Sequence, residues 1–353
     1  MAVSRINEAG LNINQYGNRN LIINGEMQVA QRGSVPAIQS AYGACDRFKL
    51  TSNSAARFDT SQSTDVPSGQ GFASSLKLDC STADTSVAAG DLYTIQQLIE
   101  GQNLQHLLYG TSSAKQITLS FWVKSPKTGI HNLEVESVDG GTFNIHQYTI
   151  ASANTWQNVK MTIDGYQTTA IANDNTAGLN INWWLLAGTT FSGGSYSENT
   201  WHSTNNKRAV GQVNVADSTS NDFYLTGVQL EVGDTATDFE HRTFGDELAR
   251  CQRYYYDPNA QNSSTLNGNM FLIEAFGSGG VGSFCFPVTM RAAPSVSIFG
   301  ERDDEAGKIR NTRTGAYVGG SAAATNIGTN GFGFVTGLSG SLDTDEVYDC
   351  TYK

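Results

Sequence analysis

Five histidines are the first residues to consider for chemistry, because an imidazole can ligate a metal ion or act as a general base. They are His106, His131, His146, His202 and His241, and each stands alone in the sequence. His131 and His146 fall in two segments that we expect to be neighbouring strands, where the rings could approach each other. A pair without a third ligand or a carboxylate at a defined spacing does not specify a metal site, so we expect surface histidines.

Motifs of the familiar catalytic classes are missing from the sequence: it has no GxSxG, no HExxH, no phosphate-binding loop and no dinucleotide fingerprint. Carboxylates are numerous, but abundance alone does not define the acid pair of a glycosidase. The acidic run Asp303-Asp304-Glu305 could bind Ca²⁺, although such a run is more often a solvated turn. We expect no enzymatic activity, no cofactor and no metal site.

The five cysteines lie far apart, and none belongs to a CxxC pair. An odd and sparse set describes neither a disulfide framework nor a zinc site. We therefore expect free, buried thiols in a protein made in a reducing cytoplasm. The residues are Cys45, Cys80, Cys251, Cys285 and Cys350.

Aromatic side chains in polar surroundings are the stronger candidates for a binding site. Trp122 and Lys124 share the polar face of a predicted strand, and Tyr196 and Trp201 lie in a long polar loop. Aromatic rings stack on the apolar faces of a pyranose while polar groups bond its edges, so these four residues form a candidate glycan-binding set. The alternative is that the rings pack between sheets or between subunits.

Alternation of apolar and polar residues predicts the elements that position these side chains. Residues 116–125 alternate cleanly, with Ile117, Leu119 and Phe121 on one face. Residues 91–108 are ambiguous: they fit either a helix or a strand at 93–97 followed by a short helix. In 179–187, Trp183 or Trp184 has to point away from the core side. Further strands are expected at 21–23, 76–80, 132–138, 142–150, 156–163, 222–232, 270–276, 281–288, 295–299, 316–318, 331–335 and 346–352.

Many short strands with few helices indicate an all-β chain. We expect a jelly roll or β-sandwich over 20–242, a linking helix over 243–256 and a smaller β-sandwich over 257–353. Residues 1–19 form a polar arm that orders only against a partner, or a disordered terminus. The linking helix begins with a capping box at 243–246, and Leu248, Cys251 and Tyr255 form its inward stripe. With Phe239, these residues would lock the two domains together.

The overall charge restricts the possible partners. A formal net charge of −11 without basic clusters argues against nucleic-acid binding. Residues 1–25 contain no apolar segment typical of a secretory signal. No apolar run approaches the roughly 20 residues of a membrane helix, so we expect no membrane insertion.

Several segments in a fixed order carry a resemblance to a known family. They are NLIINGEMQVAQRG, YGACDRFK, ITLSFWVKS, VQLEVGDTATDFEHRTFGDELARCQRYY and FPVTMRAAPSV, and they run from about residue 20 to residue 296. In combination they resemble virion appendage proteins of tailed phages, namely tail-fibre and head-fibre proteins with a jelly roll like that of carbohydrate-binding modules.

The resemblance implies a structural protein of the virion, assembled in the host cytoplasm without a signal peptide. Its N-terminal arm would dock onto other virion proteins, its β domains would project outward, and the assembly would be a homotrimer. The leading hypothesis is attachment to host surface polysaccharide. The alternatives are a capsid decoration or connector protein that stabilises the particle, and a glycan-cleaving enzyme, which would need a carboxylate pair in an open groove.

Overall fold

The computed structural model divides the chain into two compact units. It describes residues 18–257, 271–276, 279–299, 309–311, 317–318, 323–336 and 347–352. The first unit includes Ser34–Thr243 and the segment before Val29, and the second includes Val29–Gly33 and the chain from Phe244 onward. Val29–Gly33 was expected in the jelly roll. The acidic run at 303–305 lies outside the described residues.

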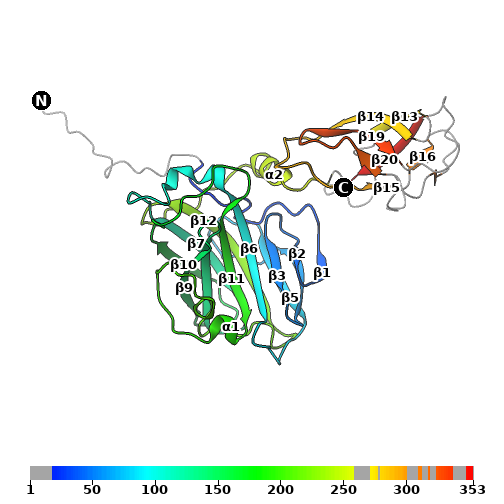
Figure 1. Cartoon of the computed structure of the whole chain (residues 1–353). Helices are drawn as coiled ribbons and strands as arrows, with labels where there is room; N and C mark the ends of the chain where they lie inside the picture. Colours follow the sequence, from blue (N-terminus) through cyan, green and yellow to red (C-terminus); the bar gives the residue numbers. More distant parts are fainter. Residues whose placement is uncertain are drawn as a thin grey trace, which may run out of the picture. The chain divides into compact units, whose positions relative to one another are not determined.

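The first unit is a sandwich of two antiparallel six-stranded sheets, as the alternation predicts (Figure 1). Sheet 1 has the order β1 (Val35–Ile38), β4 (Arg57–Ser63), β5 (Ser75–Thr82), β12 (Asp222–Val232), β7 (Ile117–Lys124) and β10 (Gln157–Ile163). Sheet 2 has the order β2 (Ala41–Tyr42), β3 (Lys49–Ser52), β6 (Leu92–Glu100), β11 (Ala177–Ala187), β8 (Gly129–Ser137) and β9 (Thr142–Ile150). Strands far apart in sequence are neighbours in both sheets, which is typical of a jelly roll.

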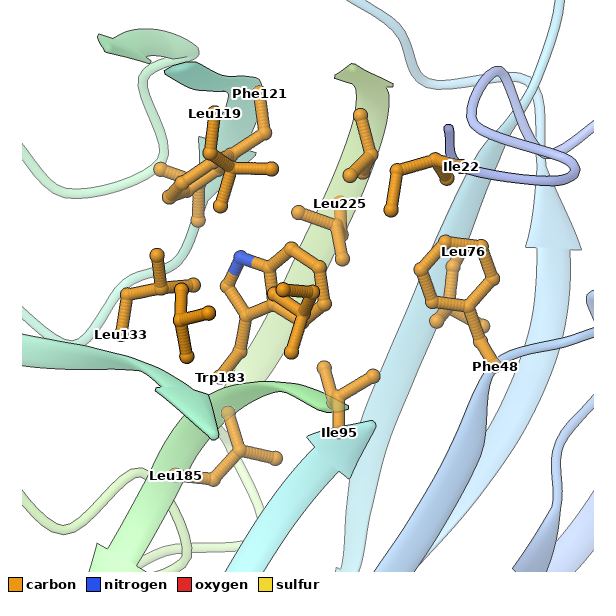
Figure 2. Close-up of a cluster of buried hydrophobic side chains, with 14 of the residues drawn as sticks. Ile22, Phe48, Leu76, Ile95, Leu119, Phe121, Leu133, Trp183, Leu185 and Leu225 are labelled. Atoms are coloured by element: carbon orange, nitrogen blue, oxygen red, sulfur yellow. The ribbon is translucent and has the colours of Figure 1, made fainter. Parts of the chain in front are cut away.

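The core of this unit lies between the two sheets (Figure 2). Leu119 and Phe121 enter it from β7, and Leu133 enters it from β8. Trp183 is fully buried among these side chains, whereas Trp184 points to the opposite face of β11 and contacts Phe191 there. The expectation that one tryptophan of the pair leaves the core side is therefore confirmed, but both rings are buried.

The structure decides one open sequence expectation about secondary structure and contradicts another. Residues 92–100 form β6, so the strand alternative holds, and only the 3-10 turns Gly101–Asn103 and Gln105–Leu107 follow it. Residues 21–23 do not form a strand. Ile22 is buried, but the segment is held by the Asn20 side chain, which accepts from the backbone N–H groups of Ile22 and Leu230.

The start of the described chain is fastened to the segment that follows β12. The Glu240 carboxylate accepts from the backbone N–H groups of Asn18 and Asn20. The Arg242 guanidinium donates to the carbonyls of Asn20 and Ile22. Residues 18–19 thus bind the body of the first unit, whereas they were expected in the partner-dependent arm; residues 1–17 lie outside the described part.

A long segment after β11 contains α1 (Thr189–Ser192) and the 3-10 turn Asn205–Lys207. Arg208 fastens this segment to sheet 2 by a bidentate ion pair with Glu134, with two nitrogen–oxygen distances of 2.7 Å. Its guanidinium also lies 3.9 Å from the centre of the Phe143 ring. The segment is therefore an ordered cover on the outer face of β8 and β9.

In the second unit, the described strands connect into one sheet rather than two separate ones. Its order is β17 (Tyr317–Val318), β16 (Ile309–Asn311), β20 (Val347–Tyr352), β13 (Phe271–Phe276), β14 (Gly279–Cys285), β19 (Gly331–Thr336) and β18 (Ala323–Thr325), and β15 (Ile298–Phe299) pairs with β20. The sequence patterns missed β16 and β18, which have three residues each. Cys285 is exposed, contrary to expectation, whereas the thiols of Cys45, Cys80 and Cys251 are buried.

Helix α2 (Phe244–Gln252) opens the main part of the second unit. Its buried residues are Glu247 and Cys251, and Leu248 is only half-buried. Tyr255 follows the end of the helix, so the expected stripe of Leu248, Cys251 and Tyr255 is wrong in part. Within this unit Tyr255 packs under Arg32, whose guanidinium lies 3.5 Å from the ring centre. Phe239 belongs to the first unit and contacts Phe72.

Candidate glycan-binding face

A row of aromatic and cationic side chains crosses the outer face of sheet 1. Lys124 of β7 pairs with Tyr224 of β12, and Tyr224 pairs with Lys77 of β5. Trp156 directly precedes β10, whose Gln157 pairs with Val123 of β7, so the indole lies beside Lys124. We call Trp122, Lys124, Trp156, Tyr224, Lys77 and Asp65 the aromatic face.

The two lysines lie against the rings of this row. Lys124 Nζ is 4.2 Å from the centre of the Tyr224 ring and 5.5 Å from that of Trp156. Lys77 Nζ is 5.9 Å from the Tyr224 ring centre. Trp156 and Tyr224 meet edge to face at 6.1 Å. Cation–π and edge-to-face contacts of this kind fix the orientation of the rings.

Asp65, in the loop after β4, bonds two members of the row. Its carboxylate accepts from Lys124 Nζ and, at 2.9 Å, from Trp156 Nε1. Burial alone would raise the pKa of Asp65, but the hydrogen bonds from Lys124 and Trp156 and the charge of Lys124 outweigh it. The pKa of Asp65 is therefore held below its ordinary value, and the carboxylate is ionised near neutral pH.

Trp122 extends the face by one position along β7. It lies opposite Asn158 of β10 and Thr226 of β12. Beside it, a bulge in β12 places Gly227 at a φ of 60°. A Cβ atom on Gly227 would lie 2.6 Å from the Phe72 ring and 3.0 Å from the Trp122 ring. The glycine is therefore required for the close approach of these two rings.

The face combines partly accessible rings with polar groups. Trp122 and Trp156 are half-buried, whereas Tyr224 and Lys124 are 9% and 8% exposed. The indoles offer apolar surface, and the Asp65 carboxylate and nearby amides offer hydrogen-bonding groups. This arrangement can bind a pyranose ring by stacking and by bonds to its hydroxyls.

No family model matches the chain, and no curated protein matches it. Among solved structures, it is similar to the enzymatically active domain of tailspike protein 4 of bacteriophage CBA120, at 14% identity, covering 61% of this chain and 22% of that chain, with a TM-score of 0.32. It is also similar to a family 11 carbohydrate-binding module of a Clostridium thermocellum cellulase (12% identity, 60% and 98% covered, TM-score 0.29). A third is a CBM22 xylan-binding domain from Paenibacillus barcinonensis (11% identity, 62% and 96% covered, TM-score 0.27). At these values the likeness carries no argument about ligand or activity.

The four residues of the candidate glycan-binding set expected from the sequence lie in two separate places. Trp122 and Lys124 lie together on the aromatic face, but Tyr196 and Trp201 lie beside the edge of sheet 2. Tyr196 Oη accepts from the backbone N–H of Gln147 in β9. Trp201 packs on Tyr166 at 4.9 Å between ring centres, and its Nε1 donates to the Asp164 carbonyl. For Trp201 the packing alternative describes the structure better than a free ring.

Sequence reasoning found two of the six residues of the face, Trp122 and Lys124, and missed the other four. Trp156 and Tyr224 were placed in or beside predicted strands, but nothing in the sequence paired those strands with β7. Asp65 and Lys77 gave no signal at all, because their role depends on the register of β5, β7 and β12. The sequence of β12 did contain one indication of the face. Tyr224 and Thr226 are two residues apart, so they lie on the same side of this strand as the missed row.

No group of three or more His, Cys, Asp or Glu side chains in the described part of the chain is arranged to hold a metal ion. Within the same residues, no helix has the length and apolar character that crossing a membrane requires. His131 and His146 are buried rather than exposed, at 0% and 4%, so the expectation of surface histidines is wrong for these two.

Acid is expected to loosen the aromatic face. Because the folded-state pKa of Asp65 is lowered, its contacts are complete above the ordinary carboxyl pKa of about 3.9 and are lost only as the pH falls through the lower folded value. The indole ¹⁵N–¹H resonance of Trp156 should report this, with a midpoint below about 3.9. In Asp65→Asn the same resonance should not titrate in that range. A wild-type midpoint at or above the ordinary value would contradict the assignment.

Proposed function

We propose that this protein is a fibre-type structural appendage of a phage virion and that its first unit binds host-surface glycans through the aromatic face. The observation that carries the glycan part is the fixed row of Trp156, Lys124 and Tyr224, extended by Trp122. Stacking surface and charged hydrogen-bonding groups are combined there on one rigid sheet, which is what recognition of a sugar requires.

The virion part of the proposal rests on the sequence resemblance and is supported by the fastening of the N-terminal segment. Glu240 and Arg242 hold residues 18–22 against the first unit, which fixes the point where the described chain begins. A docking arm needs such an anchor, because only a firmly attached arm can hold the first unit in a defined position on the virion. The proposed assembly is a homotrimer, and light scattering on the purified chain should give the mass of three copies; a monomer would remove this part.

We propose binding without cleavage. A glycosidase needs a carboxylic acid whose pKa is raised, so that it can donate a proton to the leaving group. Asp65 has the opposite shift, because Lys124 and Trp156 stabilise its ionised form. Burial raises the pKa of Asp222, but this carboxyl group is already hydrogen-bonded to Tyr224. Incubation with host polysaccharide should therefore release no new reducing ends.

A direct test compares matched variants on an array of bacterial capsule and O-antigen oligosaccharides. Trp156→Ala and Trp122→Ala each remove a stacking surface, which should cost about 1–2 kcal/mol of binding free energy, or roughly 5- to 30-fold in affinity. Trp201→Phe is the control, because Trp201 packs on Tyr166 outside the face, and its affinity should stay within about twofold. Equal losses in all three variants, or no binding by the wild type, would reject the glycan site.

The second candidate is a decoration or connector protein whose aromatic face is covered by a neighbouring subunit. It is favoured by the half-buried rings of Trp122 and Trp156, whose remaining apolar surface is of the kind that subunit interfaces cover. A map of the assembled particle separates the two proposals. An open aromatic face on the projecting surface supports attachment, and a face buried within a closed shell or ring supports decoration.

A further inference from the structure

A polar pocket opens between β9 and β10, the last strands of sheet 2 and sheet 1. It has a volume of about 660 Å³ and is lined by both strands and by Glu198 and Asn199 of the segment after β11. That segment runs along β9: Asn199 donates its backbone N–H to the Ile145 carbonyl. We call this the edge pocket. Its walls belong to rigid strands, so the pocket is preformed.

Two buried side chains of β9 line the edge pocket, and each has one polar atom without a hydrogen bond to the described residues. His146 is 4% exposed, and its Nε2 has no hydrogen bond to any described residue. Tyr148 is 6% exposed, and its hydroxyl also lacks a partner among the described residues. Buried polar groups are almost always bonded, because an unmade bond costs free energy. A ligand or water in the pocket can supply the missing partners.

Burial keeps the His146 ring neutral. Burial lowers the pKa of His146, although Glu198, Asn199 and Asp164 each act in the opposite direction. A neutral imidazole donates at one nitrogen and accepts at the other. Together with the Tyr148 hydroxyl, which can do both, the pocket offers donors and acceptors to the same ligand.

The lining indicates the chemical class of that ligand. Most of the polar side chains are uncharged amides and hydroxyls, such as Gln147, Gln157 and Thr162. The two charged residues, Lys160 and Glu198, have opposite signs. A phosphate would need several cations, and a lipid would need an apolar wall. Met161 adds a small apolar surface. A neutral polyhydroxylated ring fits all of these features.

We propose that the edge pocket binds one neutral sugar residue, whose hydroxyls bond His146 Nε2 and the Tyr148 hydroxyl. This site extends the proposed glycan recognition, but it lies between the sheets and uses none of the rings of the aromatic face. A host glycan would then be held at two points of the first unit. Neither point requires the other, so each can be tested alone.

The experiment is a ¹⁵N–¹H titration of the full chain with glucose, galactose, mannose and N-acetylglucosamine, each at millimolar concentrations. At least one sugar should shift the backbone amides of residues 146–149 and 157–162. Tyr148→Phe removes only a hydroxyl, and His146→Phe removes the ring nitrogens; each should weaken binding about tenfold.

The matched control is Tyr109→Phe. Tyr109 is 4% exposed and its hydroxyl also has no hydrogen bond to any described residue, but it does not line the edge pocket. Its variant should bind within about twofold of the wild type. The proposal is overturned if none of the four sugars shifts these amides, or if the Tyr109 and Tyr148 variants bind equally well.

Trp156→Ala separates this site from the aromatic face. If the edge pocket is independent, the variant binds oligosaccharides on the array roughly 5- to 30-fold more weakly but retains the amide shifts caused by the single sugar. Loss of both would show that the shifts come from the aromatic face and would overturn the edge pocket. If the array shows no binding at all while the amide shifts remain, the aromatic face fails and the edge pocket stands.

Discussion

Replacing Arg208 with alanine is expected to lower the free energy of unfolding of the first unit by about 3–5 kcal/mol. Arg208 makes two 2.7 Å bonds to the Glu134 carboxylate, which is completely buried. Asn182 Nδ2 donates to the same carboxylate at 2.9 Å. Without the guanidinium, one amide would be left to compensate a buried negative charge, and that is the costly case for an ion pair.

The guanidinium also holds the covering segment in place through packing. It stacks over Phe143 and lies 5.4 Å and 5.7 Å from the ring centres of Trp184 and Phe191. Truncation at Arg208 therefore removes one of several contacts between sheet 2 and the segment that contains α1, which also meets the sheet through Phe191 and Asn199. The loss should exceed that of an exposed ion pair, which contributes about 0–1 kcal/mol.

Tryptophan fluorescence during denaturant unfolding measures this effect on the first unit alone. All five tryptophans, at positions 122, 156, 183, 184 and 201, belong to that unit. The control is Lys77→Ala, which breaks a 2.9 Å pair between partly exposed side chains and should cost no more than about 1 kcal/mol. Adding Glu134→Gln to Arg208→Ala should recover part of the loss, because it removes the unpaired charge. Equal effects of Arg208→Ala and Lys77→Ala would refute the argument.

The strands were predictable wherever one face alone is apolar. In β7 the odd-numbered residues face the core and the even-numbered ones face outward, so local alternation is sufficient. In β6 the local signal misleads, because Ile95 and Ile99 face the core while Leu98 lies half-buried on the other face. Their spacing imitates a helical stripe, and only the pairing of β6 with β3 and β11 decides for a strand.

The candidate sites were less predictable than the strands, since both depend on which strands are neighbours. Trp122 and Lys124 could be placed on one face from their spacing of two residues. Trp156 and Tyr224 join them only because β10 and β12 flank β7, and the sequence does not contain that register. The edge pocket depends on the same kind of information, because it exists where the ends of two sheets meet.

The stretch from β12 to Tyr255 is another segment whose long-range contacts the sequence did not predict. Its strand and helix were expected from local pattern, and it was interpreted as a junction between domains. The structure shows a further role within the first unit: Glu240 binds the N-terminal segment, and Gln229 holds Glu240. Glu240 binds Asn20, and its own backbone N–H donates to Gln229 Oε1. Contacts over more than 200 residues of sequence leave no local signature.

Replacing Trp183 with alanine should lower the free energy of unfolding by a similar amount, about 3–5 kcal/mol, for a different reason. The indole is 0% exposed and lies at the centre of the core (Figure 2). It meets Phe121 edge to face at 5.8 Å and Phe48 at 6.2 Å. Phe121 belongs to β7 of sheet 1, and Phe48 directly precedes β3 of sheet 2, so the ring fills the space between the sheets and its removal leaves a cavity.

Trp122→Ala is the matched comparison, because Trp122 is half-buried on the outer face and water can occupy the space that it leaves. Its cost should stay below about 2 kcal/mol. Fluorescence of the four remaining tryptophans during denaturant unfolding measures both variants. If Trp183→Ala costs no more than Trp122→Ala, the two sheets do not depend on this ring for their separation. A large difference shows that the core ring sets the spacing of the sandwich, on which the alignment of β9 and β10 around the edge pocket depends.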